Sequence, residues 1–264
     1  MTLSAPPAAT GTRSGTQTLS RGFAVVQAVA DGATTLRDVA AATGLTKPTA
    51  HRLIRGLVDE RVLAEDSRGI RLGPRLLAWG GRAQSQNPVV VVARPVLEEL
   101  AATVKDTVHL ASELSGTMTY LFKIDGTRGA WMRSRVGGTE PLTRTGVGKA
   151  LLLDAPERWR SQYLEDSALA RPKQADPPAP GPQADFELFL RRMDAYRAVG
   201  VAYDLEENEP GIRCVAAPVR DATGCTVAAI SVSATSPYMP PERMQSLRAT
   251  VLEAAQRIGT GLGA

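Results

Sequence analysis

The chain has 264 residues, of which 43% are hydrophobic, so it is long for one domain and sufficient for two hydrophobic cores. Two cysteines and two histidines are too few for a disulfide framework or a cysteine-based zinc site, and we expect no metal and no other cofactor. The net charge of +4 is unevenly distributed, because residues 1–82 hold 11 Lys and Arg against 6 Asp and Glu, and the remainder holds 20 against 21. This distribution indicates that the N-terminal third contacts an anionic partner such as nucleic acid.

Residues 1–16 are rich in Ala, Pro, Thr and Ser and lack the apolar centre of a secretory signal. Such a composition predicts a disordered tail. No run of about 18 apolar residues follows, so we expect no membrane-spanning helix and a cytoplasmic protein.

Two helices are expected after this tail. Ser20 is placed to cap the first, over 20–31, whose apolar residues recur at helical spacing. Thr35 and Asp38 form a capping pattern for the second, over 35–42. Gly44 follows where a helix commonly ends in a left-handed turn.

A third helix is predicted over 47–60, with Thr46 as its cap and Pro48 in its first turn. One face is apolar and comprises Ala50, Leu53, Ile54, Leu57 and Val58. The other face is polar and basic and comprises Lys47, His51, Arg52 and Arg55.

Two short apolar runs, 62–64 and 70–72, flank a polar turn and predict a hairpin. A helix over 75–85 then leads to Asn87-Pro88, where we place a boundary. The predicted organisation is a winged helix-turn-helix domain over 17–74, a linker helix over 75–88 and a second domain over 89–264.

Two helices joined by a glycine turn, the second one basic, are typical of the helix-turn-helix, whose second helix enters the major groove. Arginines reach guanine edges or phosphates, and hydroxyls at the helix start suit phosphate oxygens. The alternative is a solvated basic face on an ordinary helical bundle, and His51 is equally consistent with a packing or solvent-exposed role. The candidate DNA contacts are Arg21, Thr46, Lys47, Thr49, His51, Arg52, Arg55, Arg68 and Arg71.

The second domain mixes helices and strands in an order that predicts an α+β fold with an antiparallel sheet. Strands are expected over 109–114, 117–124, 130–136, 213–220 and 226–234. Helices are expected over 89–105, 148–153, 156–165, 185–198 and 240–258, and a proline-rich loop over 171–183.

The chain resembles the IclR family of bacterial transcription regulators from about Gln17 to Leu262. In the first domain the resemblance is carried by LRDVAAATGLTKPTAHRLIRGLVDERVL (36–63) and RLGPRLLAWG (71–80). In the second it is carried by ARPVLEELAATVKDTVHLA (93–111), GVGKALL (146–152) and GVAYDLEENEPGIRCVAAPVRDATG (200–224).

The resemblance implies a GAF-like effector domain, a homodimer or homotetramer, and a near-palindromic double-stranded operator. It implies a small organic acid or aromatic catabolite as the effector, and repression as the commoner mode of control. The family's effector cavity maps onto Gly146, Val147, Asp204, Cys214, Ser231 and Ser233.

The chemistry of these positions leaves alternatives open. Ser231 and Ser233 are two apart on a strand, so both hydroxyls project from one face. Gly146 permits close backbone approach, and successive N–H groups there suit a carboxylate. Asp204 either faces the effector in a protonated or hydrogen-bonded form or accepts backbone N–H groups in its own turn, and Cys214 is equally suited to packing.

The sequence departs from the family pattern at Thr143 and Arg144, where many relatives carry a histidine and a small residue. Arg144 would be a bidentate partner for an effector carboxylate if it faces the cavity, and a surface charge if it faces outward. The sequence does not choose between these orientations.

The residues also leave two other classes of protein open. An enzyme would need a nucleophile beside a base, and a triad of Cys214, His109 and Asp204 is conceivable, but no nucleophile-elbow or phosphate-loop motif is present. An architectural DNA-binding protein would need no effector cavity. We therefore expect no catalytic residues and a sequence-specific regulator, more often a repressor, controlled by a small molecule.

Overall fold

The computed structural model describes residues 16–114, 116–128, 132–169 and 182–263. The predicted tail therefore lies outside the described residues except for Thr16, as does nearly all of the predicted loop over 171–183. The chain divides into two compact units, Met1–Gln84 and Ser85–Ala264. This division falls inside the stretch that the sequence assigns to a linker helix.

The first unit packs three helices and a hairpin around one small core. Its helices are α1 (Gln17–Ala30), α2 (Leu36–Thr43) and α3 (Lys47–Asp59), followed by α4 (Pro74–Ser85). The hairpin consists of β1 (Leu63–Asp66) and β2 (Gly69–Leu72), paired antiparallel. The core is apolar and comprises Val25, Val29, Val39, Ile54, Leu63 and Ile70.

Local capping explains why α2 and α3 form a helix-turn-helix. The Thr35 hydroxyl accepts from the Asp38 N–H, and the Asp38 carboxylate accepts from the Thr35 N–H, which confirms the predicted capping box. Gly44 ends α2 at φ 67°, a left-handed conformation that glycine adopts without strain.

Two predicted caps are wrong in detail. Ser20 lies inside α1, which begins three residues earlier, and its hydroxyl donates to the Thr16 carbonyl. Thr46 is the N-cap residue of α3, but its hydroxyl donates to Thr49 Oγ1 at 3.0 Å and accepts no N–H. Both helices are instead stabilised by their buried faces.

The hairpin is fixed to the helices through its backbone. The Ile70 N–H donates to the Thr34 carbonyl at 2.8 Å, just before α2 begins. Gly69, at φ 100°, lies so close to Thr34 that a Cβ would sit 2.5 Å from that carbonyl oxygen. The hairpin is therefore a wing with a set position relative to α2 and α3.

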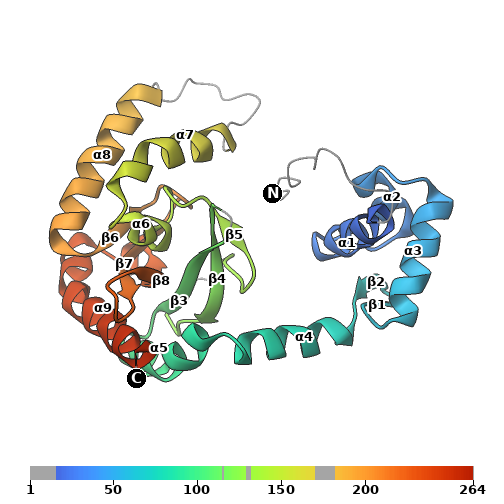
Figure 1. Cartoon of the computed structure of the whole chain (residues 1–264), viewed down its shortest axis with the longest axis horizontal. Helices are drawn as coiled ribbons and strands as arrows, with labels where there is room; N and C mark the ends of the chain where they lie inside the picture. The colour runs from blue at the N-terminus through green and yellow to red at the C-terminus, as the bar shows by residue number, and fades with distance from the viewer. Residues whose placement is uncertain (1–15, 115, 129–131, 170–181, 264) are drawn as a thin grey trace. The chain divides into compact units, whose positions relative to one another are not determined.

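The second unit is built on one antiparallel sheet with the strand order β5-β4-β3-β8-β7-β6 among the described residues (Figure 1). Its strands are β3 (Thr107–Leu114), β4 (Thr117–Ile124), β5 (Thr139–Glu140), β6 (Ala202–Leu205), β7 (Ile212–Arg220) and β8 (Thr226–Thr235). Its helices are α5 (Pro88–Val104), α6 (Gly146–Leu152), α7 (Trp159–Leu169), α8 (Pro182–Val199) and α9 (Pro241–Leu262), with 3-10 turns at Pro156–Arg158 and Ser236–Tyr238.

The α+β class and the antiparallel sheet confirm the prediction, and two strand assignments do not. The strand expected over 130–136 is not formed in its described part, residues 132–136, and the edge strand is the short β5. Strand β6, which pairs with β7, was not predicted from the sequence. The two edge strands, β5 and β6, are only two and four residues long, which is too short for an alternating pattern to be recognised in the sequence.

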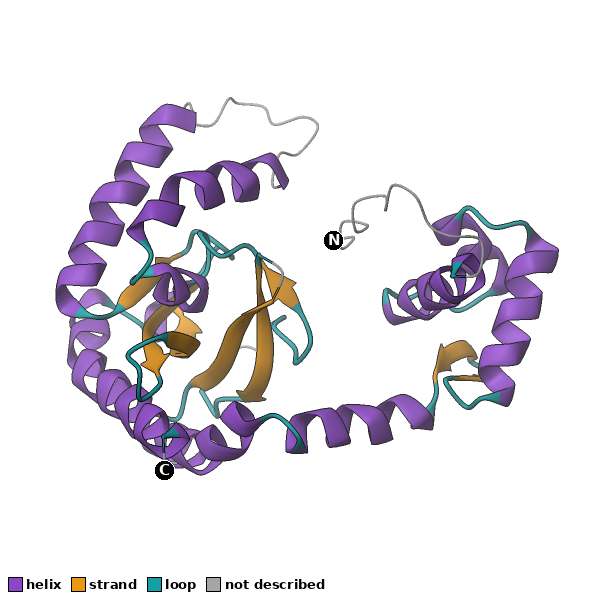
Figure 2. Ribbon diagram, viewed as in Figure 1, coloured by secondary structure: helices purple, strands orange, loops and turns teal. Residues whose placement is uncertain are grey.

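One face of the sheet is apolar and is covered by α5 and α9 (Figure 2). Val215, Ile230 and Val232 are fully buried there. The opposite face is covered by α6 and carries Ala111, Ala216 and Ala229 at its apolar end. The polar end of this opposite face holds the candidate effector site.

Helix α9 approaches the sheet closely at Gly259, where a Cβ would overlap the Arg220 carbonyl oxygen. Gly259→Ala is expected to lower the free energy of unfolding of the second unit by about 1–3 kcal/mol, because backbone must move to admit the methyl group. Gly56→Ala in α3, whose Cβ would meet nothing within 4 Å outside its own stretch of helix, is the control and should stabilise its unit by up to about 1 kcal/mol. Urea unfolding measures both, and equal stabilities would contradict the packing at Gly259.

Candidate functional site

The N-terminal half of α3 presents the residue types that DNA binding needs. Thr46, Lys47, His51, Arg52 and Arg55 are exposed, and Thr49 is half-buried. The opposite face is anchored in the core by Ala50 and Ile54, which are buried as predicted. A rigid helix with an exposed basic face is the geometry of a recognition helix. Arg21 is exposed on α1.

The wing arginines are held by an acidic neighbour that the sequence analysis did not consider. Asp66 Oδ2 accepts from Arg71 Nε at 2.9 Å and from Arg68 Nη2 at 3.2 Å. The Arg68 N–H donates to Asp66 Oδ1, and these bonds together hold the pKa of the Asp66 carboxyl far below its usual range. Asp66 therefore orients both guanidinium groups and offsets part of their charge.

The sheet register brings the predicted effector residues together. In an antiparallel sheet, residues directly opposite one another project from the same face. Asp204 is opposite Cys214, and Cys214 is opposite Ser233. Ser231 is opposite His109 on the other side of β8. All five side chains are buried on the face that α6 covers.

His109 is the centre of a hydrogen-bonded cluster. Its Nδ1 lies 3.3 Å from Ser231 Oγ and 3.4 Å from Ser233 Oγ, and its Nε2 lies 2.8 Å from Ser134 Oγ. The Tyr120 ring packs against the imidazole with centroids 4.9 Å apart. Burial lowers the pKa of His109 to about 3, so the ring is neutral and provides one donor and one acceptor.

A second group forms where α6 meets the edge of the sheet. A Cβ on Gly146 would overlap Cys214 Sγ and would lie 3.3 Å from the Asp204 nitrogen. Burial raises the pKa of the Cys214 thiol to about 12, so this residue is an uncharged thiol. Gly146 is required here because no side chain fits between α6 and β7.

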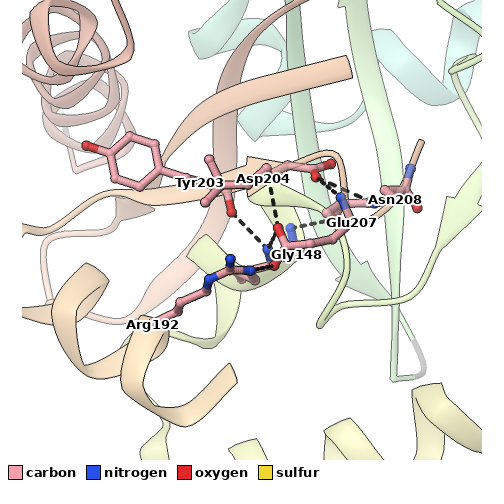
Figure 3. A network of polar contacts seen from close by, with 9 residues as sticks. Gly148, Arg192, Tyr203, Asp204, Glu207 and Asn208 are labelled. Carbon is pink, nitrogen blue, oxygen red and sulfur yellow. Dashed lines mark hydrogen bonds and ion pairs between the residues drawn. The ribbon is translucent and has the colours of Figure 1, made fainter. Parts of the chain in front are cut away.

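Asp204 adopts the second of the roles that the sequence left open. Its Oδ1 accepts from the N–H groups of Glu207 at 2.9 Å and Asn208 at 3.5 Å, in the turn that follows β6 (Figure 3). Burial nevertheless raises the pKa of its carboxyl to about 6. The effect of burial is larger than the opposing effects of Lys149 and the two turn N–H groups, which lower this pKa.

Lys149 of α6 is a buried cation that the sequence analysis missed. Its ammonium group donates to the Tyr203 carbonyl at 2.8 Å and pairs with Glu207 Oε2. Arg192 of α8 donates to Glu207 Oε1 at 2.9 Å, so Glu207 links α6 to α8 (Figure 3). The network holds α6 against β6 and leaves Lys149 paired.

In the loop before α6, Thr143 points into the protein and Arg144 points outward. The Thr143 N–H and hydroxyl both donate to the buried Asp166 carboxylate, at 2.8 and 2.7 Å, so Thr143 points inward. Arg144 is exposed and does not join the cluster around His109. The hypothesis that Arg144 binds an effector carboxylate is therefore not supported, because the adjacent residue occupies the inward position.

The geometry does not assemble a catalytic triad. The hydrogen bonds of the His109 ring among the described residues go to serines, and Cys214 Sγ lies against backbone atoms of Gly146 and Asp204. A neutral histidine with so low a pKa and a thiol with a raised pKa do not form a base and nucleophile. The sequence did not predict His109, Tyr120 or Lys149 as effector residues. The alternation of Thr107, His109 and Ala111 on β3 was the available signal for His109, because it puts this residue on the same face of the sheet as Ser231 and Ser233.

A chain that carries a winged helix-turn-helix unit and a separate α+β unit with a buried polar cluster has the organisation of a DNA-binding transcription regulator with a ligand-binding domain. The family model described as "IclR helix-turn-helix domain" matches residues 18–67, and "Bacterial transcriptional regulator IclR C-terminal" matches residues 81–260. The second match alone covers more than half of the chain. The chain therefore belongs to the IclR family and is an effector-controlled regulator of transcription.

Curated relatives carry regulator names. The chain is 29% identical over 221 residues to the HTH-type transcriptional regulator KdgR of Escherichia coli, covering 83% of this chain and 82% of that protein. It is also 29% identical over 256 residues to the HTH-type transcriptional repressor AllR of Klebsiella pneumoniae, covering 94% and 91% respectively.

Solved structures share the fold along nearly the whole chain. A putative transcriptional regulator from Rhodococcus sp. RHA1 matches with a TM-score of 0.76 and 29% identity, covering 93% of this chain and 98% of the other. An IclR homologue from Microbacterium hydrocarbonoxydans, solved with 4-hydroxybenzoate, matches with a TM-score of 0.74 and 24% identity, covering 93% and 99%. Among the described residues, no helix combines the length and apolar character needed to cross a membrane.

Arg52→Ala is expected to weaken binding to a specific duplex by about 1–3 kcal/mol, the usual cost of losing a guanidinium contact to a base edge. Binding to random duplex should weaken less. Fluorescence anisotropy at one fixed salt concentration measures both affinities. Arg191→Ala, which removes an exposed arginine from α8 in the other unit, is the control. Equal losses on both duplexes would show that Arg52 contacts only phosphate.

The raised pKa of Asp204 predicts a pH-dependent stability. Between pH ~4 and ~6 the folded protein retains a proton that the unfolded chain has released, so the free energy of unfolding falls as pH rises, by about 2–3 kcal/mol in total. Asp204→Asn keeps the oxygen that accepts from Glu207 and lacks the charge, so it should be more stable than the wild type at pH 7.5 and nearly equal at pH 4. Urea unfolding at both pH values measures this difference.

Asp59→Asn, at an exposed carboxylate of α3, is the control for the loss of one negative charge. A difference between Asp204→Asn and the wild type that does not change with pH would contradict the assignment of the proton to Asp204.

Proposed function

We propose that this chain is a sequence-specific repressor whose α3 reads a near-palindromic operator and whose second unit releases DNA when an effector binds. The observation that carries the proposal is the exposed basic face of α3, held by a capped α2 and by a wing fixed through its backbone. The AllR relative, which has a similar sequence along nearly the whole chain, is named a repressor, and this supports the same direction of control.

We infer that the functional unit is a homodimer or a dimer of dimers. The first unit exposes large apolar side chains that a lone subunit would leave in water: Leu19, Phe23, Leu77 and Trp79. Leu77 is 81% exposed and Phe23 is 64% exposed, on α4 and α1. A second copy, paired through these helices, would bury them and would present two recognition helices to an operator with two-fold symmetry.

The proposed effector site is the polar end of the sheet face under α6, lined by Gly146, Val147, Cys214, Ser231 and Ser233, with Asp204 at its edge. The effector class carried over from the family is a small organic acid or an aromatic catabolite. One solved neighbour is complexed with 4-hydroxybenzoate, a small aromatic acid, and the likeness of its fold supports a ligand of similar size here.

The relatives are regulators, and no catalytic arrangement surrounds Cys214 in the described part of the chain. We therefore propose that the effector leaves the protein chemically unchanged. A DNA-binding regulator acts where the chromosome is, which supports a cytoplasmic protein.

Selection of bound sequences from a random double-stranded DNA pool, with the full-length chain, tests the function. An enriched inverted repeat is expected, with half-sites about one helical turn apart, because two copies of α3 would enter adjacent major grooves on one side of the duplex. Affinity for the selected sequence should fall steeply with salt. A pool without enrichment, or a single unrepeated half-site, would contradict the proposed symmetric repressor.

A further inference from the structure

We propose that the effector of this regulator is an uncharged molecule with hydroxyl or carbonyl groups, and that its polar end is recognised by His109, Ser231 and Ser233 in place of a free carboxylate. This inference rests on the proposed function, since it specifies the ligand of the same site. Of the effector classes named above, an uncharged catabolite fits this description and a free organic acid does not.

The side chains that meet at the site are polar and neutral. The imidazole of His109 lies within 3.4 Å of both serine hydroxyls of β8 and bonds Ser134 on its other side. Each hydroxyl both donates and accepts, and the neutral ring has one donor and one acceptor. A ligand hydroxyl, which also donates and accepts, matches this set without leaving a buried group unpaired.

The lysines beside the site are already occupied. The Lys123 ammonium donates to the carbonyls of Met132 and Ser134 and pairs with Asp125 at 2.7 Å, which uses its three protons. Lys149 pairs with Glu207 and the Tyr203 carbonyl, and Arg144 is exposed. Among the described residues around the cluster, none of these cations is left to neutralise a buried effector carboxylate.

Two carboxylates also lie near the site. Asp204 lies beside Cys214, and burial raises its pKa to about 6. Glu140 of β5 has a raised pKa because its own burial and the nearby Glu209 outweigh the opposing effect of the exposed Arg144. Together with its burial, both carboxylates help to raise the pKa of the Tyr120 hydroxyl, and the Tyr120 ring packs on His109. A third carboxylate, brought in by an anionic effector, would meet repulsion from these two.

The start of α6 does not supply the missing positive potential. The Thr145 hydroxyl accepts from the Gly148 N–H, and the Thr145 carbonyl accepts from the Lys149 N–H. The Gly146 N–H is directed at Cys214 Sγ. The backbone donors at which the sequence analysis placed a carboxylate are therefore largely used within the protein.

The test uses matched pairs of compounds that differ only in replacement of the carboxylate by CH2OH. The pairs are 4-hydroxybenzoate with 4-hydroxybenzyl alcohol, benzoate with benzyl alcohol, and glycerate with glycerol. Binding to the full-length chain is measured at pH 7.5 by calorimetry, and DNA release is measured on the selected operator. We expect at least one alcohol to bind tenfold or more tightly than its acid.

Variants of the serines and of His109 test whether the alcohol binds at this cluster. The double variant Ser231→Ala with Ser233→Ala should lose at least tenfold in affinity for that alcohol, and His109→Phe should lose a similar factor because it keeps the ring and removes both nitrogens. Ser161→Ala, which removes an exposed serine hydroxyl from α7, is the matched control and should bind as the wild type does. His109→Phe also serves if the double variant does not fold.

Tighter binding of the acid in any pair, or no binding of any alcohol up to its solubility limit, overturns the inference. If an acid binds, is lost in the serine double variant and releases DNA, the proposed function stands and only the class of effector is wrong. If an alcohol binds at the serines and DNA affinity does not change, the class of ligand stands and the proposed control of DNA binding fails.

Discussion

The pairing register of the central strands is the constraint on which the second unit depends. Because β3, β8 and β7 pair antiparallel, His109, Ser231 and Ala216 lie in one row, and Ser233 and Cys214 lie in the next. A shift of one residue in any strand would carry the polar side chains to the face covered by α5 and α9 and would bring apolar residues under α6. The packing of the apolar face therefore also fixes the polar site.

The two faces of the sheet in the second unit differ in the kind of side chain that they bury. The face under α5 and α9 is almost wholly apolar, so its burial drives folding without a requirement for specific polar partners. The face under α6 holds polar groups that burial would penalise if they were unpaired, and each one described above has a partner that fixes it. The buried polar groups of this face are therefore held in fixed positions relative to one another.

The DNA-binding unit follows the same logic on a smaller scale. Its core is small, and its recognition surface depends on local devices such as the Thr35–Asp38 capping box and the backbone contact of the wing with Thr34. Asp66 orients the arginines of the wing and offsets part of their charge.

The sequence by itself determined the helix-turn-helix, because capping residues, a glycine turn and an amphipathic helix are local signals that lie within a few residues of one another. Alternation placed Ser231 and Ser233 on one face for the same reason. Only the tertiary structure decided that His109 joins them, that Lys149 is paired and that Arg144 faces outward. Those outcomes depend on strand register and on Thr143 reaching Asp166, contacts between residues far apart in the chain that no local pattern encodes.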